Sequence, residues 1–127
     1  MRRATGKTPA TVSRSQPEES IRTGLGVDAI VEALVENLRC LQAKLPQHAT
    51  RNDWYMALAY TVRDRALDGY IKTLQPMTAA GHTVKVVGYF SAEFLTGPHL
   101  GNNLINLGIW EGTEQGLSKV GQSLSSV

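Results

Sequence analysis

The chain has 127 residues, of which 42% are hydrophobic and 19% are charged, and its formal net charge is +2. This length suits one small domain, and the composition matches ordinary globular proteins, which excludes a wholly disordered chain. The low net charge argues against a nucleic-acid partner, and no apolar run reaches the ~18 residues that span a membrane. The one cysteine, Cys40, excludes an intramolecular disulfide framework and favours a reducing, cytoplasmic location.

Residues 1–25 differ in composition from the rest of the chain. They carry five basic and two acidic residues, whereas residues 26–127 carry eight basic and nine acidic ones. The segment is rich in Thr, Ser and Pro, and its few apolar residues cannot bury enough surface to offset the entropy of ordering. The sequence predicts a disordered basic arm, and a transit peptide is the alternative interpretation.

The first predicted helix runs from Val27 to about Lys44. Its apolar residues follow the three-and-four spacing of one helix face, with Asp28 in the first turn and Pro46 after the end. Cys40 lies beside this face. We expect it to be a small core residue, because nothing nearby would make it a reactive thiolate.

A second, longer helix is predicted from Thr50 to about Gln75. Thr50 and Asp53 resemble a capping box, and Pro76 is expected to end the helix. A helix of about 24 residues would be ~36 Å long. Its apolar face is wider than one neighbouring helix can cover, so the helix calls for further packing partners.

Residues 84–90, VKVVGYF, are the one strong candidate for a β-strand. β-branched and aromatic residues dominate, and the run is nearly all apolar after Lys85, which is typical of a strand covered on both faces in a parallel sheet. One strand cannot form a sheet alone. The strand therefore indicates that this chain is incomplete as a fold.

The last part of the sequence predicts one short helix and then a tail. The helix is expected between the Gly97-Pro98 turn and Gly108, and its tandem residues Asn102 and Asn103 are poor helix formers that invite hydrogen-bonding roles. After Glu111 the chain has three glycines, each of which disfavours a helix by ~1 kcal/mol relative to Ala. We expect residues 111–127 to be a frayed, flexible tail.

Few residue patterns point to catalysis. The three histidines are dispersed and no HxxxH or CxxC spacing occurs, so we expect no metal site. Glu93 follows the predicted strand at its carboxyl end, where ligands bind in α/β folds. From the residues alone Glu93 is either an active-site carboxylate or a structural acid near the next helix, and the structural role is the commoner one.

Two blocks of the sequence resemble the α-glucan phosphorylases, the family that acts on glycogen, starch or maltodextrin. Residues 88–109, GYFSAEFLTGPHLGNNLINLGI, are similar to the N-terminal signature of the family, above all in its bacterial branch. Residues 49–65, ATRNDWYMALAYTVRDR, are similar to the family's capped second helix. The resemblance runs from about Thr23 to Glu111 and is lost in the tail.

The resemblance implies an activity for a longer enzyme. Members of the family transfer a terminal glucosyl unit from an α-1,4-glucan to phosphate, releasing glucose 1-phosphate in glycogen catabolism. They use pyridoxal phosphate and are usually dimers. The implied fold class is α/β, and the chain would be a mostly helical N-terminal piece of a double Rossmann-like glycosyltransferase fold, with two long helices, one buried strand and one short helix.

The resemblance also implies a division of the chain. Residues 1–25 would be the disordered basic arm, residues 26–110 the helical and strand segment of the first phosphorylase domain, and residues 111–127 a divergent flexible tail. The family's cofactor lysine and phosphate-binding residues lie beyond the matched region. We therefore expect a truncated chain that is inactive alone, contains no catalytic residue and binds no pyridoxal phosphate.

Only Glu93 acquires a site role from the resemblance, as a residue that lines the substrate cleft. Phe94, Gly97, Asn102 and Asn103 match the motif and are expected to support its loop. The partners of the longer enzyme would be the glucan, phosphate and a second copy of the chain. The alternative function is a non-catalytic helical interaction module that binds another protein chain, such as a full-length phosphorylase.

Overall fold

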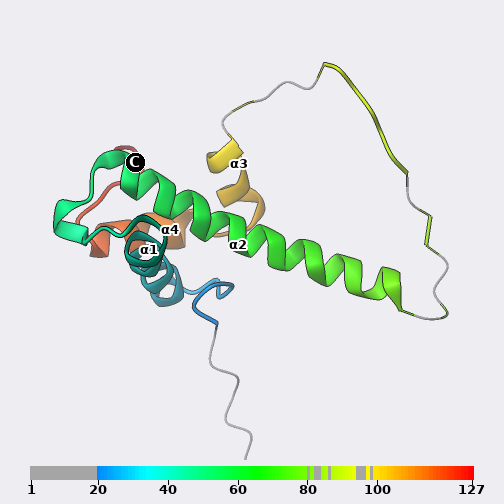
Figure 1. Cartoon of the computed structure of the whole chain (residues 1–127), viewed down its shortest axis with the longest axis horizontal. Helices are drawn as coiled ribbons and strands as arrows, with labels where there is room; N and C mark the ends of the chain where they lie inside the picture. Colours follow the sequence, from blue (N-terminus) through cyan, green and yellow to red (C-terminus); the bar gives the residue numbers. More distant parts are fainter. Residues whose placement is uncertain (1–19, 80, 82–83, 86, 94–96, 98) are drawn as a thin grey trace, which may run out of the picture.

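The computed structural model describes residues 20–79, 81, 84–85, 87–93, 97 and 99–127. These residues form the helices α1 (Val27–Gln42), η1 (Pro46–His48, a 3-10 turn), α2 (Arg51–Thr78), α3 (His99–Asn106) and α4 (Trp110–Lys119). In Figure 1, α1 packs against the first half of α2 and α4 packs against α1, while the second half of α2 extends away from this group. The predictions made for residues 1–19 lie outside the described residues.

Helix α1 confirms the first predicted helix. Ile30, Leu34 and Leu38 form a stripe that is completely buried, as their spacing predicts. The helix ends where Ala43 adopts a left-handed conformation, with φ of 51°, and its N–H donates to the carbonyl of Leu38. A left-handed residue after the last turn is a common way of satisfying the final carbonyls of a helix.

Helix α2 begins at the predicted capping box. The Thr50 N–H donates to Asp53 Oδ2 at 2.8 Å, and the Asp53 N–H donates to Thr50 Oγ1 at 3.3 Å. The expectation that Pro76 ends the helix is wrong, because α2 continues to Thr78. A proline removes its own N–H from the ladder, and here the helix ends within one turn, so little is lost. The 28 residues of α2 make it ~42 Å long.

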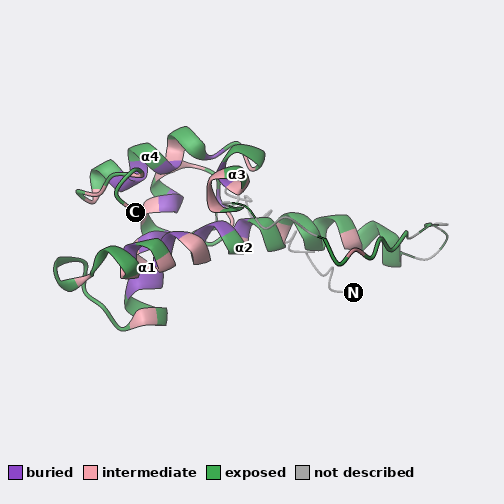
Figure 2. Cartoon of the chain, turned by 90° about the horizontal axis from the view of Figure 1, so that it is seen from above, coloured by how far each residue is buried: buried purple, intermediate pink, exposed green. Residues whose placement is uncertain are grey.

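A small apolar core lies where α1, the first half of α2, α3 and α4 meet. Figure 2 shows the buried positions concentrated there and the second half of α2 largely exposed. The core cluster consists of Ile30, Leu34, Leu38, Trp54, Ala57, Leu58, Val62, Leu104, Ile109 and Leu117. Inside it the amide of Asn37 donates to Thr61 Oγ1 at 3.0 Å, and this buried polar group is thereby satisfied.

Arg65 attaches residues 20–25 to α2. Its side chain is buried, at 3% exposure, and its Nε donates to the Gly24 carbonyl at 2.7 Å. Its Nη1 donates to the carbonyls of Thr61 at 2.9 Å and of Arg22 at 3.2 Å. Residues 20–25 therefore belong to the folded part of the chain, so the expectation that disorder extends to residue 25 is wrong for them.

Helix α4 occupies Trp110–Lys119, where the sequence predicts a frayed tail, so that prediction is wrong there. The glycines that disfavour a helix also allow α4 to approach α1 closely. A Cβ on Gly116 would lie 3.3 Å from Val31 Cγ2, and a Cβ on Gly112 would lie 3.5 Å from Ile30 Cδ1. The packing of this helix against α1 outweighs the low helix propensity of its glycines.

The described residues of the predicted strand, 84–85 and 87–90, do not form a strand. Residues 84–85 and 87–90 have no regular secondary structure, and Val87, Tyr89 and Phe90 are 89%, 80% and 96% exposed. The reason is that the described residues include no other strand, so this segment has no backbone to pair with. The structure is thus mostly helical where it is described.

The second half of α2 carries an apolar face that nothing in the described part of the chain covers. Leu67, Tyr70, Ile71 and Met77 are all exposed there. This observation agrees with the expectation that the long helix needs more packing partners than one helix supplies. We call these four residues the α2 apolar face.

Candidate functional site

Glu93 lies in the irregular segment that precedes α3. Its side chain is exposed, and its backbone N–H donates to Ser91 Oγ at 3.0 Å, which closes a local turn. The carboxylate has no hydrogen-bond or ion-pair partner among the described residues. Glu93 is therefore available to a ligand or to another part of a protein, but no described residue joins it in a site.

The other motif residues are spread over the same region. Phe94 lies outside the described residues, and Gly97 and Asn102 are exposed. Asn103 is half-buried on α3 and lines a groove of about 340 Å³ between α2 and α3. The lining of this groove consists of Tyr55, Ala59, Val62, Arg63, Ala66, Leu67, His99, Leu100 and Asn103. Asn103 thus lies beside α2, and Glu93 is not among the residues that line this groove.

Two carboxyl groups with lowered pKa values lie in the first turns of helices α1 and α2. The hydrogen bond and charge of Lys119, whose Nζ lies 2.7 Å from Asp28 Oδ1, lower the pKa of Asp28. Hydrogen bonds from the backbone and hydroxyl of Thr50 lower the pKa of Asp53. Both shifts favour a charged carboxylate, whereas a general acid needs a raised pKa. These two groups therefore stabilise helix packing and capping and do not form an acid-base pair.

No group of three potential metal ligands occurs among the described residues. None of the helices described here is long and apolar enough to cross a membrane.

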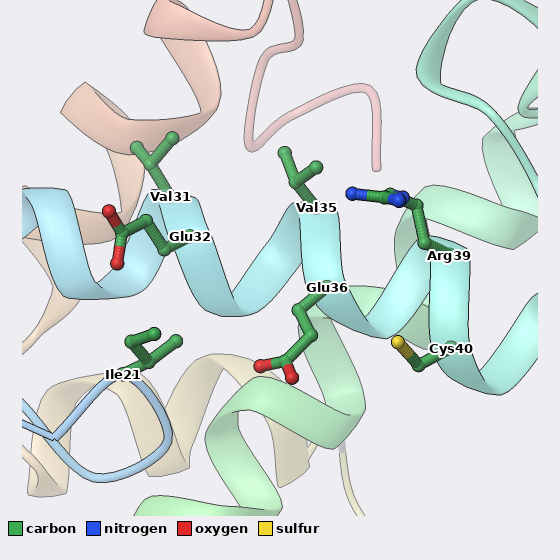
Figure 3. Close-up of a pocket in the computed structure, with 7 residues that line it drawn as sticks. All are labelled: Ile21, Val31, Glu32, Val35, Glu36, Arg39 and Cys40. Carbon is green, nitrogen blue, oxygen red and sulfur yellow. The ribbon is translucent and has the colours of Figure 1, made fainter.

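The sequence did not predict a surface groove along α1. A groove of about 430 Å³ runs along α1, and Figure 3 shows its lining of Ile21, Val31, Glu32, Val35, Glu36, Arg39 and Cys40. Cys40 is exposed in it, so the expectation that Cys40 is a core residue is wrong. The pairs Val31/Val35 and Glu32/Glu36 repeat every four residues, a spacing that already places them on one helix face. We call this feature the α1 groove.

Comparison with curated proteins identifies relatives of the chain. It is 51% identical to a glycogen phosphorylase of Synechocystis sp. over 86% of its length, and 34% identical to a glycogen phosphorylase of Chlamydia trachomatis over 79%. It is 31% identical to the brain form of glycogen phosphorylase of Bos taurus over 94% of its length. The chain spans 13%, 12% and 14% of these three proteins, respectively.

The extent of the match changes the expected limits of the similarity. The match to the Bos taurus protein covers 94% of the chain. It must therefore include residues of α4, and the similarity continues beyond Glu111. No family model matches the chain. No solved structure matches it either. The chain is thus homologous to the glycogen phosphorylases, over a segment that makes up about 13% of their length.

Proposed function

We propose that this chain is the N-terminal piece of an α-1,4-glucan phosphorylase, an enzyme that transfers a glucosyl unit from glycogen or a related glucan to phosphate. The observation that carries the proposal is the 51% identity with the Synechocystis glycogen phosphorylase over 86% of the chain. Because the chain corresponds to 13% of that protein, the chain by itself is catalytically inactive. The glucan, phosphate and a second copy would be partners of the longer enzyme.

The described residues do not fit the pyridoxal phosphate that the family resemblance implies. A cofactor lysine needs an enclosed site in which its amine and the cofactor phosphate are both held. The described lysines, Lys44, Lys72, Lys85 and Lys119, are all exposed. Lys72 pairs with Asp68 at 2.6 Å and Lys119 pairs with Asp28 at 2.7 Å. The cofactor site therefore belongs to other parts of the longer enzyme.

The role of this piece within the enzyme is to supply a strand and a loop. Residues 84–90 have the composition of a buried strand, yet Val87 and Phe90 are almost fully exposed in this chain. Pairing with a sheet of the double Rossmann-like fold would bury them, at ~25 cal/mol per Å² of apolar surface. The same pairing would bring Glu93, just beyond the strand, to the edge of the substrate cleft. The α2 apolar face would pack against the same body.

The test is a two-chain complementation. A Synechocystis glycogen phosphorylase polypeptide without its matching segment is produced with this chain, and glucose 1-phosphate release from glycogen and phosphate is measured. We expect no release from either polypeptide alone and release from the co-purified pair. Turnover by this chain alone would contradict the proposed inactivity, and a stable but silent pair would contradict the proposed role.

The role of Glu93 is tested in the same complemented enzyme. Glu93→Gln should lower the rate of glucose 1-phosphate release by tenfold or more, because a cleft carboxylate loses its charge. Glu114→Gln is the matched control, since Glu114 is an exposed acid on α4 outside the motif. Equal rates of glucose 1-phosphate release for the two variants would contradict the proposal that Glu93 lines the substrate cleft.

A non-catalytic interaction module is the second candidate function. It is favoured by the compact helical core, which forms without the strand, and by the exposed α2 apolar face. A module would give a defined complex with an intact phosphorylase in sedimentation and pull-down experiments. A piece of the enzyme would bind only the polypeptide that lacks the matching segment, and would be poorly soluble without it.

A further inference from the structure

The α1 groove has an apolar side and an acidic side. Val31 and Val35 are half-buried along one edge of α1, and Figure 3 shows Ile21, from the turn before the helix, across Glu32 from them. Figure 3 shows Ile21 and Glu32 toward one end of the groove, with Arg39 and Cys40 toward the other. A surface of this shape and volume suits an extended peptide rather than a flat protein face.

The two carboxylates of the α1 groove form no ion pair within the described part of the chain, although Arg39 lines the same groove. Neither Glu32 nor Glu36 has a hydrogen bond or an ion pair with any residue that the structure describes. The two carboxylates are four residues apart on one helix face, where like charges destabilise a helix. A cationic occupant would relieve this repulsion and gain two charge-assisted contacts.

The chain itself supplies a segment of complementary charge next to the groove. Residues 1–19 carry four basic residues, Arg2, Arg3, Lys7 and Arg14, against Glu18 and Glu19. The described part of the chain starts at Ser20, directly beside the groove residue Ile21. The segment is therefore tethered at one end of the groove, which gives it a high effective concentration there.

We propose that residues 1–19 occupy the α1 groove, with Arg14 paired to Glu32 and Glu36 and with Val12 against the apolar side. The reach is sufficient. The seven residues from Arg14 to Ile21 span up to ~23 Å when extended, at ~3.3 Å each. The helix from Glu32 to Cys40 is only ~12 Å long, at 1.5 Å per residue. The inference concerns this chain alone and does not rest on the proposed enzymatic function.

Cys40 provides a direct readout of this occupancy, because it is the one cysteine of the chain and lies exposed at the groove. The rate of its alkylation by an uncharged maleimide is measured for the full chain, for the chain without residues 1–19, and for Arg14→Glu. A cation near a thiol favours the reactive thiolate, so its removal by itself would slow labelling. For the deletion and for Arg14→Glu, faster labelling therefore indicates that the groove has been uncovered.

We expect the deletion to speed labelling of Cys40 at least threefold and Arg14→Glu to speed it at least twofold. The double variant Glu32→Lys and Glu36→Lys replaces anions near Cys40 by cations, which speeds labelling by itself, so the informative result is that adding Arg14→Glu to this variant slows its labelling again. Lys85→Glu is the matched control, because it makes the same charge change on an exposed residue outside the groove. Circular dichroism of each variant confirms that its helices are retained.

Two results would overturn the proposal. The first is a labelling rate that changes less than twofold on deletion of residues 1–19. The second is slow labelling that persists after the deletion and becomes faster on dilution, since a second copy would then cover the groove. Raising the salt concentration should speed labelling of the full chain, because screening weakens exposed ion pairs, and should leave the deleted chain unchanged.

Discussion

Replacement of Arg65 by methionine tests whether this buried cation holds residues 20–25 against α2. The substitution keeps most of the apolar stem and removes the donors to the carbonyls of Gly24, Arg22 and Thr61. The Thr61 carbonyl can still accept the next backbone N–H of α2, and water can reach the exposed Arg22. The buried Gly24 carbonyl loses a 2.7 Å bond to a charged donor, which costs ~2–3 kcal/mol.

The expected loss is partly offset, because a buried guanidinium carries a desolvation cost of its own that the variant no longer bears. We therefore expect Arg65→Met to lower the free energy of unfolding by about 2 kcal/mol. Urea unfolding followed by circular dichroism measures this change. Hydrogen exchange at the Gly24 amide, which donates to the Ser20 carbonyl at 2.6 Å, reports the turn itself and should become faster.

Arg63→Met is the matched control for this measurement. Arg63 lies two residues away on the same helix, and its side chain is 52% exposed in an ion pair with Asp64 at 2.8 Å. An exposed pair of this kind contributes ~0–1 kcal/mol. The reasoning fails if Arg65→Met costs less than about 1 kcal/mol, or no more than Arg63→Met, with Gly24 exchange unchanged.

Two glycines and one carboxylate give further predictions. Gly116→Val should destabilise the chain by about 1–3 kcal/mol in urea unfolding, because its added atoms meet α1 at 3.3 Å; an unchanged midpoint would mean that α4 does not pack there. Gly69→Ala should stabilise it by ~0.5–1 kcal/mol, since this α2 position has open space around it, and destabilisation would argue against a continuous α2. The hydrogen bonds from Thr50 hold the pKa of Asp53 below its ordinary value of 3.8, so their stabilisation is present above about pH 4 and is lost as the pH falls through the lowered pKa. Asp53→Asn should therefore flatten the acid side of the pH-stability curve, and a curve of unchanged slope would show that the capping box is not formed.

Helix positions were predictable wherever the signal is local. The apolar spacing of α1 and the Thr50–Asp53 cap of α2 are each made by residues that are three or four positions apart. The structure confirms both predictions. The site was less predictable. The motif around Glu93 pointed to a family through its order of residues, yet the Glu93 carboxylate has no hydrogen-bond or ion-pair partner among the described residues. The role proposed for Glu93 in the substrate cleft would require segments of the longer enzyme.

The failures have a common cause, which is that burial depends on partners distant in the sequence. Cys40 lies close enough to the apolar stripe of α1 to be predicted as a core residue, but none of the described helices buries it and its side chain is exposed. Gly116 reads as a helix breaker until α1 is placed against it. The burial of Arg65, for which the sequence offered no prediction, depends on the carbonyls of the turn before α1.

The amino-acid sequence alone predicted the two long helices, the N-terminal cap of the second one and a segment with the composition of a strand. It also indicated the similarity to the glycogen phosphorylases. Each of these features depends on residue types at short, fixed spacings. Such spacings are a property of the sequence and do not change with the tertiary packing of the chain. The tertiary structure alone decided that α4 forms, that Arg65 holds the turn before α1, and that residues 84–90 remain unpaired where they are described. Helix contact and strand pairing require a second surface, and their outcome depends on whether the folded chain provides one.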